Sequence, residues 1–538
     1  MKLSPSPTLF RTLLLLLGLF LLAATAHASD PEPGFGDVID VRVVNLEVVV
    51  TAKGERVPGL SPEDFQLLVD GQEVPIEYFS EIYDGQANRE TSVGGALPAA
   101  EPGEKVGTRY LVFVDDYFAV PAYRNRVLRK LEDQLHFLEP EDRMAIVAFD
   151  GQQVEMLSSW TRSLPELRGA LAEAADRRGY GLHRYSEQRQ FDTFNRRSNS
   201  RFAFFDYDGL DLQRYDEVAW QISRVVGGAN SALRAFARPE GRKVMLLLSG
   251  GWPSSTLEWV TGEFGASAFF AESRLFEPLV NTANRLGYTL YPVDLNNDLR
   301  HSGVSAQYSS LNEATFMNNL DRRRDWLEED ALVFLAESTG GKAFLDGGAL
   351  TALERTVEDT RSYYWFGFTP TWQENDEEHS IEVKVRRKGL KVRNRTSFSD
   401  LSRQTETSML VESAQLFDLP LPGGSLSVLF GEPVKAGYKK VHLPVRLEIP
   451  LDQITIVPDS GGYSAQLELR VAATDEDGDT APIGIFPVEV RGDEPPTPRG
   501  TAAFETQLKL RRKPHRLLIS VFDPASGNMV SKRMAVSL

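Results

Sequence analysis

The sequence contains no cysteine, which excludes disulfide bonds, thiolate metal sites and cysteine nucleophiles. Histidine is scarce. The seven histidines are scattered along 538 residues, and none forms a His-Glu-x-x-His or His-x-x-x-His pair. A zinc hydrolase is therefore unsupported. Ser249 also lacks the Gly-x-Ser-x-Gly surroundings of a nucleophile elbow. We therefore expect a protein that is not an enzyme.

Positive charge is in deficit. The chain has 59 Lys and Arg against 76 Asp and Glu, which gives a formal net charge of −17. Such a surface repels nucleic acid and anionic lipid. Neither is expected as a partner.

Long apolar runs are absent except near the N-terminus. Residues 12–25 are apolar, follow Lys2 and Arg11, and precede Ala26-His27-Ala28, a small-x-small cleavage pattern. This run has the length of a secretion-signal core and is short for a membrane span. We predict a signal peptide over residues 1–28 and an exported chain, periplasmic or secreted, without a membrane span. An uncleaved N-terminal anchor is the alternative.

The first region after the signal has strand character. Residues 41–52 alternate apolar and polar side chains, with Leu46 and Val48 on one face. Residues 65–79 form two short strands about Asp70-Gly71, a hairpin signal. We predict a β module over 37–83. Residues 84–107, rich in Gly, Ala and Pro, then read as a linker.

From Tyr110 the pattern changes to apolar strands that alternate with amphipathic helices. Strands are expected at 144–149, 243–250 and 288–294. This rhythm predicts an α/β domain with a mostly parallel sheet covered by helices on both faces. Residues 177–215 interrupt it, with seven arginines between Arg177 and Arg201 among aromatic residues. We interpret them as a surface insertion that can dock on acidic groups nearby.

Strand character returns after Pro370. Residues 379–398 predict a hairpin about Lys388-Gly389, and a linker follows at 400–408. Short strands separated by Pro and Gly turns then predict an immunoglobulin-like β-sandwich over 409–538.

The ordered pieces carry a resemblance to a known family. They are VVNLEVVVTA, YLVFVDD, RKVMLLLSGG, LAESTGGKAF, RSYYWFGFTP and IEVKVRRKGLKVRNR. In this order the chain resembles the bacterial VWFA-related domain family of exported proteins. The resemblance implies a von Willebrand factor type A domain, Rossmann-like, over 108–370 with β segments on either side. We expect 37–83 and 379–398 to pack together as one β module.

The resemblance also implies where a metal would bind. Type A domains commonly hold Mg²⁺ with Asp-x-Ser-x-Ser after the first strand, a loop Thr and a later Asp. Asp115 and Thr161 match this pattern, but Tyr117, Ala119 and Gly250 replace three of the five oxygen ligands. We therefore expect a degenerate metal site and no required cofactor. The candidates for Mg²⁺ ligands are Asp115, Asp116 and Thr161. Binding would require Asp116 or Ser249 to substitute for the missing oxygen ligands.

These observations favour an exported, non-enzymatic binding protein whose partner is a protein or a cell-surface polymer. The expected contact surface is the ligand-facing edge of the sheet, formed by Asp115, Asp116, Tyr117, Ala119, Thr161, Ser249, Gly250 and Trp252. For Trp252 itself a core-edge position is the favoured interpretation, and an exposed binding hot spot is its alternative. A structural envelope or assembly protein remains open as a second function. A hydrolase using Asp115, Asp116 or Ser249 is the third.

We predict that the exported chain begins at Ser29, because the charged start, apolar core and Ala-x-Ala pattern form a complete signal. N-terminal sequencing of periplasmic or secreted material checks this. Material that begins at Met1 contradicts it.

Overall fold

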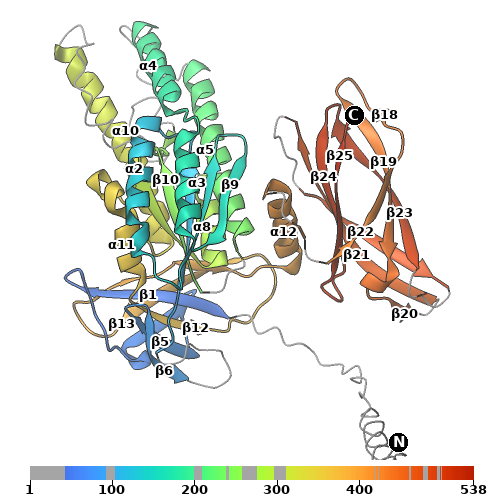
Figure 1. Cartoon of the computed structure of the whole chain (residues 1–538), viewed down its shortest axis with the longest axis horizontal. Helices are drawn as coiled ribbons and strands as arrows, with labels where there is room; N and C mark the ends of the chain where they lie inside the picture. Colours follow the sequence, from blue (N-terminus) through green and yellow to red (C-terminus); the bar gives the residue numbers. More distant parts are fainter. Residues whose placement is uncertain are drawn as a thin grey trace, which may run out of the picture. The chain divides into compact units, whose positions relative to one another are not determined.

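The structure is a computed structural model. It describes residues 43–92, 103–198, 209–237, 241–256, 275–295, 311–417, 420–421, 423–459, 462–476, 483–493, 497 and 500–538. The predicted signal peptide lies outside the described residues. The architecture is mixed α/β with several sheets (Figure 1). Among the described helices, none has the length and apolar character needed to cross a membrane.

The central sheet contains five strands in the order β11-β10-β7-β8-β9. Its strands are β7 (Thr108–Asp115), β8 (Arg143–Phe149), β9 (Val154–Thr161), β10 (Arg242–Ser249) and β11 (Tyr288–Asp294). Strands β11, β10, β7 and β8 are parallel, while β9 runs antiparallel to β8. The predicted strands at 144–149, 243–250 and 288–294 are confirmed. They read as continuous apolar runs because both faces of the sheet are buried.

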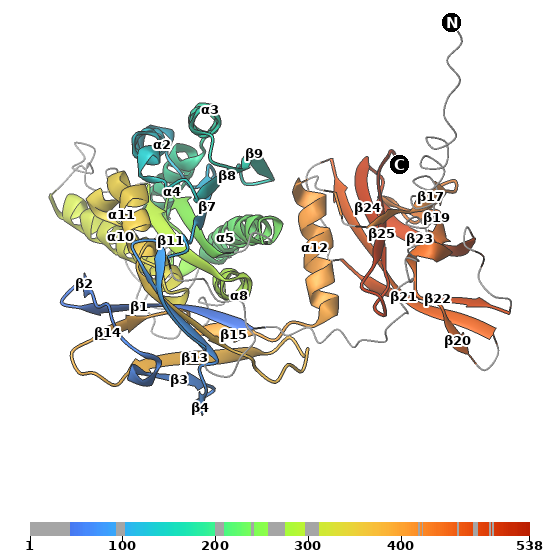
Figure 2. The ribbon, with the colours of Figure 1, turned by 60° about the horizontal axis from the view of Figure 1, so that its bottom comes forward.

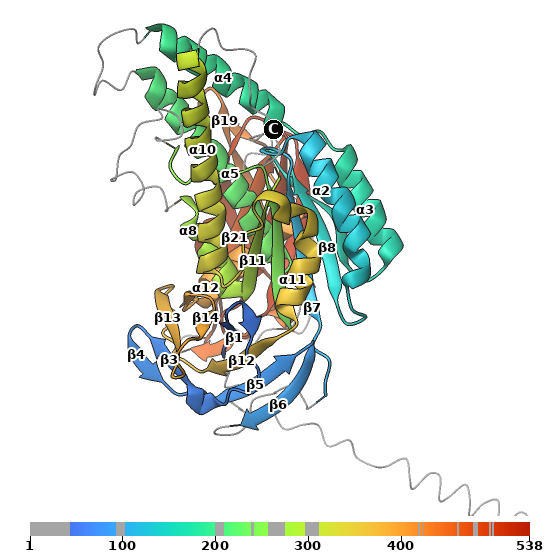
Figure 3. The ribbon, with the colours of Figure 1, turned by 90° about the vertical axis from the view of Figure 1, so that its left-hand side faces the viewer.

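Helices cover both faces of this sheet (Figure 3). One face packs against α2 (Pro121–Gln134), α3 (Leu164–Asp176) and α11 (Ala352–Thr360). The other packs against α5 (Gly209–Ala235), α8 (Glu277–Leu286) and α10 (Leu311–Ser338). Along β7, Val112 and Val114 point to the first face, and Leu111 and Phe113 point to the second. This period-2 alternation divides one strand between two cores.

Two further sheets form a β module from both ends of the α/β region (Figure 2). One has the order β14-β1-β12-β5-β6, with β2 beside β1, and the other is β15-β13-β3-β4. Their shared core includes Leu46, Phe65, Phe366 and Ile381. Their strands are β1 (Val44–Ala52), β2 (Glu55–Arg56), β3 (Phe65–Val69), β4 (Gln72–Val74), β5 (Tyr78–Tyr83), β6 (Gln86–Ser92), β12 (Tyr363–Phe368), β13 (Glu378–Val385), β14 (Lys391–Arg393) and β15 (Ser397–Ser399).

Residues 37–83 and 379–398, which we expected to pack together, supply paired strands of this module. Strand β1 pairs with β14, and β3 pairs with β13. The hairpin about Asp70-Gly71 is confirmed, since Val69 pairs with Gln72. Asp70 and Gly71 both adopt positive φ there, a conformation that two-residue hairpin turns require.

The hairpin predicted about Lys388-Gly389 is wrong. Strand β13 pairs with β3 and β15, whereas β14 pairs with β1 in the other sheet. The chain passes from one sheet to the other at this turn, because β13 and β14 each pair with a strand that is distant in sequence, β3 and β1 respectively. Part of the predicted linker 84–107 is also a strand, β6, which pairs with β5. Residues 93–102 lie outside the described part of the chain.

The aromatic run Tyr363–Phe368 forms β12 and pairs with β1 and β5. It therefore belongs to the β module and not to the central sheet, although we placed it inside a domain ending at 370. Phe366 and Tyr364 stack on Phe79 and pack near Phe65. Aromatic contacts of this kind account for the unbroken apolar sequence of the strand.

A helix stands where we expected a linker at 400–408 and sandwich strands from 409. It is α12 (Arg403–Phe417). The Ser402 hydroxyl accepts a hydrogen bond from the Thr405 N–H at 3.2 Å, which satisfies one of the free donors at the helix start. Val411 and Ala414 are buried against Leu518 and Phe522 of the following β domain. Val411 and Ala414 are three residues apart, a spacing typical of a helix. The helix was not predicted because most residues around them are polar.

The C-terminal region contains two sheets around one apolar core that includes Leu447, Leu467 and Ile519. The first sheet contains β16 (Gly424–Ser425), β20 (Val457–Asp459), β21 (Gly462–Asp475), β22 (Ile485–Gly492), β24 (His515–Phe522) and β25 (Met529–Val536). The second contains β17 (Ser427–Phe430), β18 (Val434–Lys435), β19 (Lys440–Pro450) and β23 (Thr501–Arg511). Apart from the parallel pair β16–β25, neighbouring strands run antiparallel.

One buried carboxylate joins the β module to the central sheet. Asp359 of α11 accepts from Arg56 Nη2 of β2 at 2.8 Å and Lys342 Nζ at 2.5 Å. It also accepts from Arg393 of β14 and, at 2.6 Å, from the Tyr291 hydroxyl of β11. Burial alone would raise the pKa of Asp359, but the neighbouring Arg393, Arg56 and Lys342 cations hold it well below its usual range. The carboxylate therefore stays ionised and keeps the cations neutralised.

We predict that Asp359→Asn lowers the free energy of unfolding by about 3 kcal/mol at neutral pH, because it leaves the part-buried Arg56 and Arg393 without their counter-charge. Since the folded pKa is depressed, this contribution is fully present above the unfolded value near 4. It decreases progressively as pH falls from there through the depressed folded pKa. Urea unfolding at pH 7 and pH 3 measures both effects. The difference between variant and parent should shrink at pH 3.

Asp133→Asn is the matched control. Asp133 contacts Lys130 at 3.0 Å on an exposed helix face, where ion pairs contribute about 0.5 kcal/mol or less. Equal losses in the two variants would contradict a special role for Asp359.

Candidate functional site

Asp115 ends β7 at the carboxyl edge of the parallel strands, and its side chain is fully buried. One carboxylate oxygen, Oδ1, accepts the backbone N–H groups of Tyr117 at 3.1 Å and Phe118 at 3.0 Å. The other, Oδ2, accepts the Ser249 hydroxyl at 3.1 Å and Trp252 Nε1 at 2.8 Å. Four protein donors thus occupy the carboxylate. It caps the turn after the strand, the role that short acidic side chains commonly take.

Burial raises the pKa of Asp115 to about 6, against the opposing effect of the hydrogen bonds from Trp252 and Phe118. The group is thus still mostly ionised at neutral pH. Its four donors, together with the charge of nearby Arg184, take the place of solvent around a buried anion.

Asp116 is also fully buried and makes ion pairs with two arginines. Arg124 Nη1 of α2 lies 2.5 Å from Oδ1, and Arg177 Nε lies 2.6 Å from Oδ2. Arg124 additionally donates to the carbonyls of Ala175 and Arg177. Asp116 therefore anchors the chain that follows α3, and both of its oxygens have cationic partners.

The segment after Arg177 closes over the turn. Tyr180 N–H donates to the Asp116 carbonyl at 2.9 Å, and Gly181 N–H donates to the Ala119 carbonyl at 3.1 Å. A Cβ built on Gly181 would lie 2.6 Å from the Ala119 carbonyl carbon. Only glycine permits this close approach of the two backbones. Helix α4 (Gly181–Ser198) begins here.

Arg184 of α4 places its guanidinium beside the same turn. Its Cζ lies 3.4 Å from the ring centre of Phe118 and 5.1 Å from that of Tyr117. Burial lowers the pKa of Arg184 to about 10, so it remains a cation at neutral pH. Stacking on two aromatic rings stabilises a desolvated guanidinium. Residues 177–215 therefore bring positive charge beside the carboxylate that ends β7.

Ser249 ends β10, the neighbour of β7, and Gly250 and Trp252 follow it. The structure brings Ser249 and Trp252 to Asp115. Ser249 and Trp252 are fully buried. The Trp252 ring stacks on Phe276, with ring centres 6.2 Å apart and planes within 2°. Trp252 is therefore a core residue held by a hydrogen bond to Asp115. This burial agrees with the core interpretation of Trp252 that the sequence favoured, and the alternative of an exposed hot spot is wrong.

Thr161 is not at this site. It pairs with Met144, whereas Asp115 pairs with Phe149 at the other end of β8. Five residues of strand separate these levels, which is about 16 Å. Because β9 runs antiparallel to β8, the last residue of β9 lies beside the start of β8, at the amino ends of the parallel strands. The Thr161 hydroxyl instead donates to Glu166 at 2.7 Å.

The predicted contact surface is therefore largely interior. Asp115, Asp116, Ala119, Ser249 and Trp252 are all buried, and Tyr117 is half-buried beneath Arg184. The remaining oxygens also fit Mg²⁺ poorly, since both Asp115 oxygens already have donors and a cation stands beside them. Among the residues that the structure describes, no three His, Cys, Asp or Glu side chains gather as a metal-binding group.

Three residues of this site were not predicted individually: Arg124, Arg177 and Arg184. The available signal was the arginine-rich insertion at 177–215, interpreted as docking on acidic groups. Asp116 is such a group. Pairing each arginine with its partner required the tertiary fold.

No protein-family model matches this chain, and no curated protein matches it. The solved structures that match include a β-glucuronidase from Bacteroides uniformis, at 13% identity and TM-score 0.16. That alignment covers 21% of this chain and 13% of the enzyme.

Two other matching structures are smaller. The N-terminal domain of TFIIH p34 aligns at 12% identity and TM-score 0.18, over 47% of this chain and 96% of that one. The SpRpn10 VWA domain aligns at 10% identity and TM-score 0.15, over 38% of this chain and 100% of that one. The likeness to a type A domain is thus weak and partial. TM-scores this low carry no functional conclusion.

We predict that millimolar Mg²⁺ leaves the melting temperature of this protein equal to its value in chelator. A ligand at one hundred times its Kd would stabilise the folded state by about 2.7 kcal/mol, a clear shift. Thermal unfolding in the two buffers measures this. An upward shift in Mg²⁺ that disappears in Asp115→Ala would show a working metal site.

Proposed function

We propose that this protein is an exported, non-enzymatic binding protein whose type A domain has exchanged its metal for internal hydrogen bonds. The carrying observation is the occupied carboxylate of Asp115, which accepts from four protein donors. A carboxylate held in this way has no free oxygen for a metal, and its buried position keeps substrate from it. Parallel strands with helices on both faces support the type A assignment. The two-sheet C-terminal region supports the immunoglobulin-like one.

The proposed contact surface lies on the outer sides of α5 and α10. Trp220 of α5 is 55% exposed and Trp326 of α10 is 52% exposed. Their helices pack inward through other residues, such as Ile222 and Leu335, which are fully buried. Large indoles that face solvent from well-packed helices are the side chains most enriched at binding hot spots.

Trp220 also stacks with a neighbouring arginine side chain of the same helix. The Arg224 guanidinium carbon, one helical turn further on, lies 4.8 Å from the centre of the Trp220 rings. Stacking of this kind holds the indole in one orientation and lowers the entropy cost of burying it against a partner. We favour a protein as that partner, with a cell-surface polymer as the alternative.

We predict that Trp220→Ala combined with Trp326→Ala reduces partner capture from envelope extract at least tenfold, because hot-spot truncations cost about 2 kcal/mol or more each. The bait is the chain from Ser29 onward, immobilised in Mg²⁺ and in chelator. Capture should be the same in both buffers. Protease treatment of the extract separates a protein partner from a polymer.

Tyr438→Ala is the control variant, since Tyr438 is 89% exposed on the C-terminal β domain. It should leave capture unchanged. The proposed surface is refuted if the double tryptophan variant captures as well as the parent. Capture that depends on Mg²⁺ would refute the metal-free mode of binding.

A further inference from the structure

We infer that β23 of the C-terminal β domain pairs with β23 of a second copy of this chain. The two strands would run antiparallel about a two-fold axis through Gln507. This inference concerns self-assembly and is independent of the binding function proposed for the tryptophan surface.

Strand β23 is a long sheet edge. All eleven of its residues, Thr501–Arg511, pair in unbroken register with β19. Within the described residues, β19 is the only strand that β23 pairs with. Every second N–H and C=O of an edge strand points away from its sheet. Strand β23 thus offers a regular, unbulged row of backbone groups to another strand.

The other edges of this β domain are short or interrupted, as edges that avoid pairing commonly are. Strand β22 carries Pro487, which has no N–H to donate. Strands β17 and β18 contain four and two residues, and β16 also contains two. In the described part of the domain, β23 differs from all of them, because it is eleven residues long and also contains neither Pro nor Gly.

The sequence of β23 is self-complementary in one antiparallel register. With Gln507 opposite its own copy, Glu505 of each chain lies opposite Lys509 of the other. Opposite charges face each other twice across the two-fold axis, an arrangement that stabilises cross-strand pairs. All three side chains are on the exposed face of the strand.

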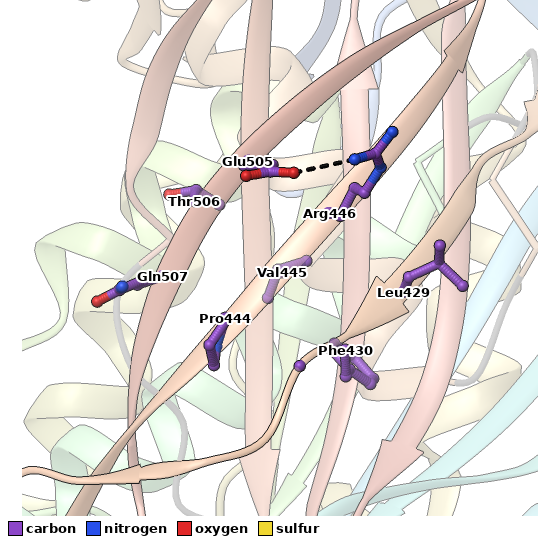
Figure 4. Close-up of a pocket in the computed structure, with 9 residues that line it drawn as sticks. Leu429, Phe430, Pro444, Val445, Arg446, Glu505, Thr506 and Gln507 are labelled. Atoms are coloured by element: carbon purple, nitrogen blue, oxygen red, sulfur yellow. Dashed lines mark hydrogen bonds and ion pairs between the residues drawn. The ribbon is translucent and has the colours of Figure 1, made fainter.

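The geometry leaves Glu505 available for this contact (Figure 4). One of its carboxylate oxygens lies 3.1 Å from Arg446 Nη1 of β19, on the side away from the free edge. The second oxygen can accept from a lysine of the neighbouring chain. Gln507 lies beside a groove of about 450 Å³ that crosses β23, β19 and β17.

The opposite face of β23 gives a second reason for pairing. Phe504, Leu508 and Leu510 pack against the domain core and are only partly buried. In the same register, Phe504 lies opposite Leu510 of the second copy, and Leu508 lies opposite Thr506. Pairing would therefore cover apolar side chains that the monomer leaves partly open to water.

Charge swapping tests the register directly. Lys509→Glu places two Glu–Glu pairs across the axis, and Glu505→Lys places two Lys–Lys pairs there. Each variant should weaken self-association about tenfold or more. A mixture of the two variants restores opposite charges at both positions and should associate like the parent. Sedimentation velocity on the chain from Ser29 onward, over micromolar concentrations, measures all four samples.

Glu489→Lys on β22 is the matched control and should associate like the parent. Because the exchanged side chains face solvent, the variants should keep the folded far-ultraviolet circular dichroism spectrum. A parent chain that remains monomeric at 100 µM would overturn the inference. A Kd of that size corresponds to a binding free energy of about −5.5 kcal/mol. Single variants that associate as tightly as the parent, or a mixture that does not recover, would overturn the inference too.

Discussion

A single buried carboxylate sets the geometry of the first two-thirds of the molecule. Asp359 receives Arg56 and Arg393 from the β module, Lys342 from the loop after α10, and Tyr291 from the central sheet. Burying Asp359 alone would be costly, and so would burying Tyr291 or partly burying Arg56 and Arg393 without it; together these groups offset that cost. The β module therefore has one position against the central sheet that satisfies all of these charges.

The same physical rule explains the opposite end of the sheet. Asp115 and Asp116 are buried anions, and the protein supplies their partners from its own chain: backbone N–H groups, Ser249, Trp252 and arginines. Every carboxylate oxygen of this site already has a donor from the protein. The site is therefore rigid and is not arranged to exchange ligands. This arrangement is the reason why we propose a contact surface on the outer sides of the helices rather than at the carboxylates.

Local pattern was sufficient for the central strands and for the carboxylates that end one of them. The apolar run of β10 and the acidic end of β7 carry their structure in their own residues. Thr161 could not be placed in this way, because its position depends on β9 running antiparallel to its neighbour. The burial of Trp252 depends on a hydrogen bond to a residue far away in sequence. The helix at Arg403–Phe417 was missed because its apolar positions are few and set among polar ones.

The strand pairing of the β module also bears on the order in which the chain folds. Arg56 and Asp359 are 303 residues apart in sequence, and β1 pairs with strands that lie beyond residue 360. A chain made from its N-terminus must hold β1 without these partners while the whole α/β region is completed. Contacts so distant in sequence form late. We therefore expect the pairing of β1 with β12 and β14 to close last in this region, and it ties the beginning of the α/β region to its end.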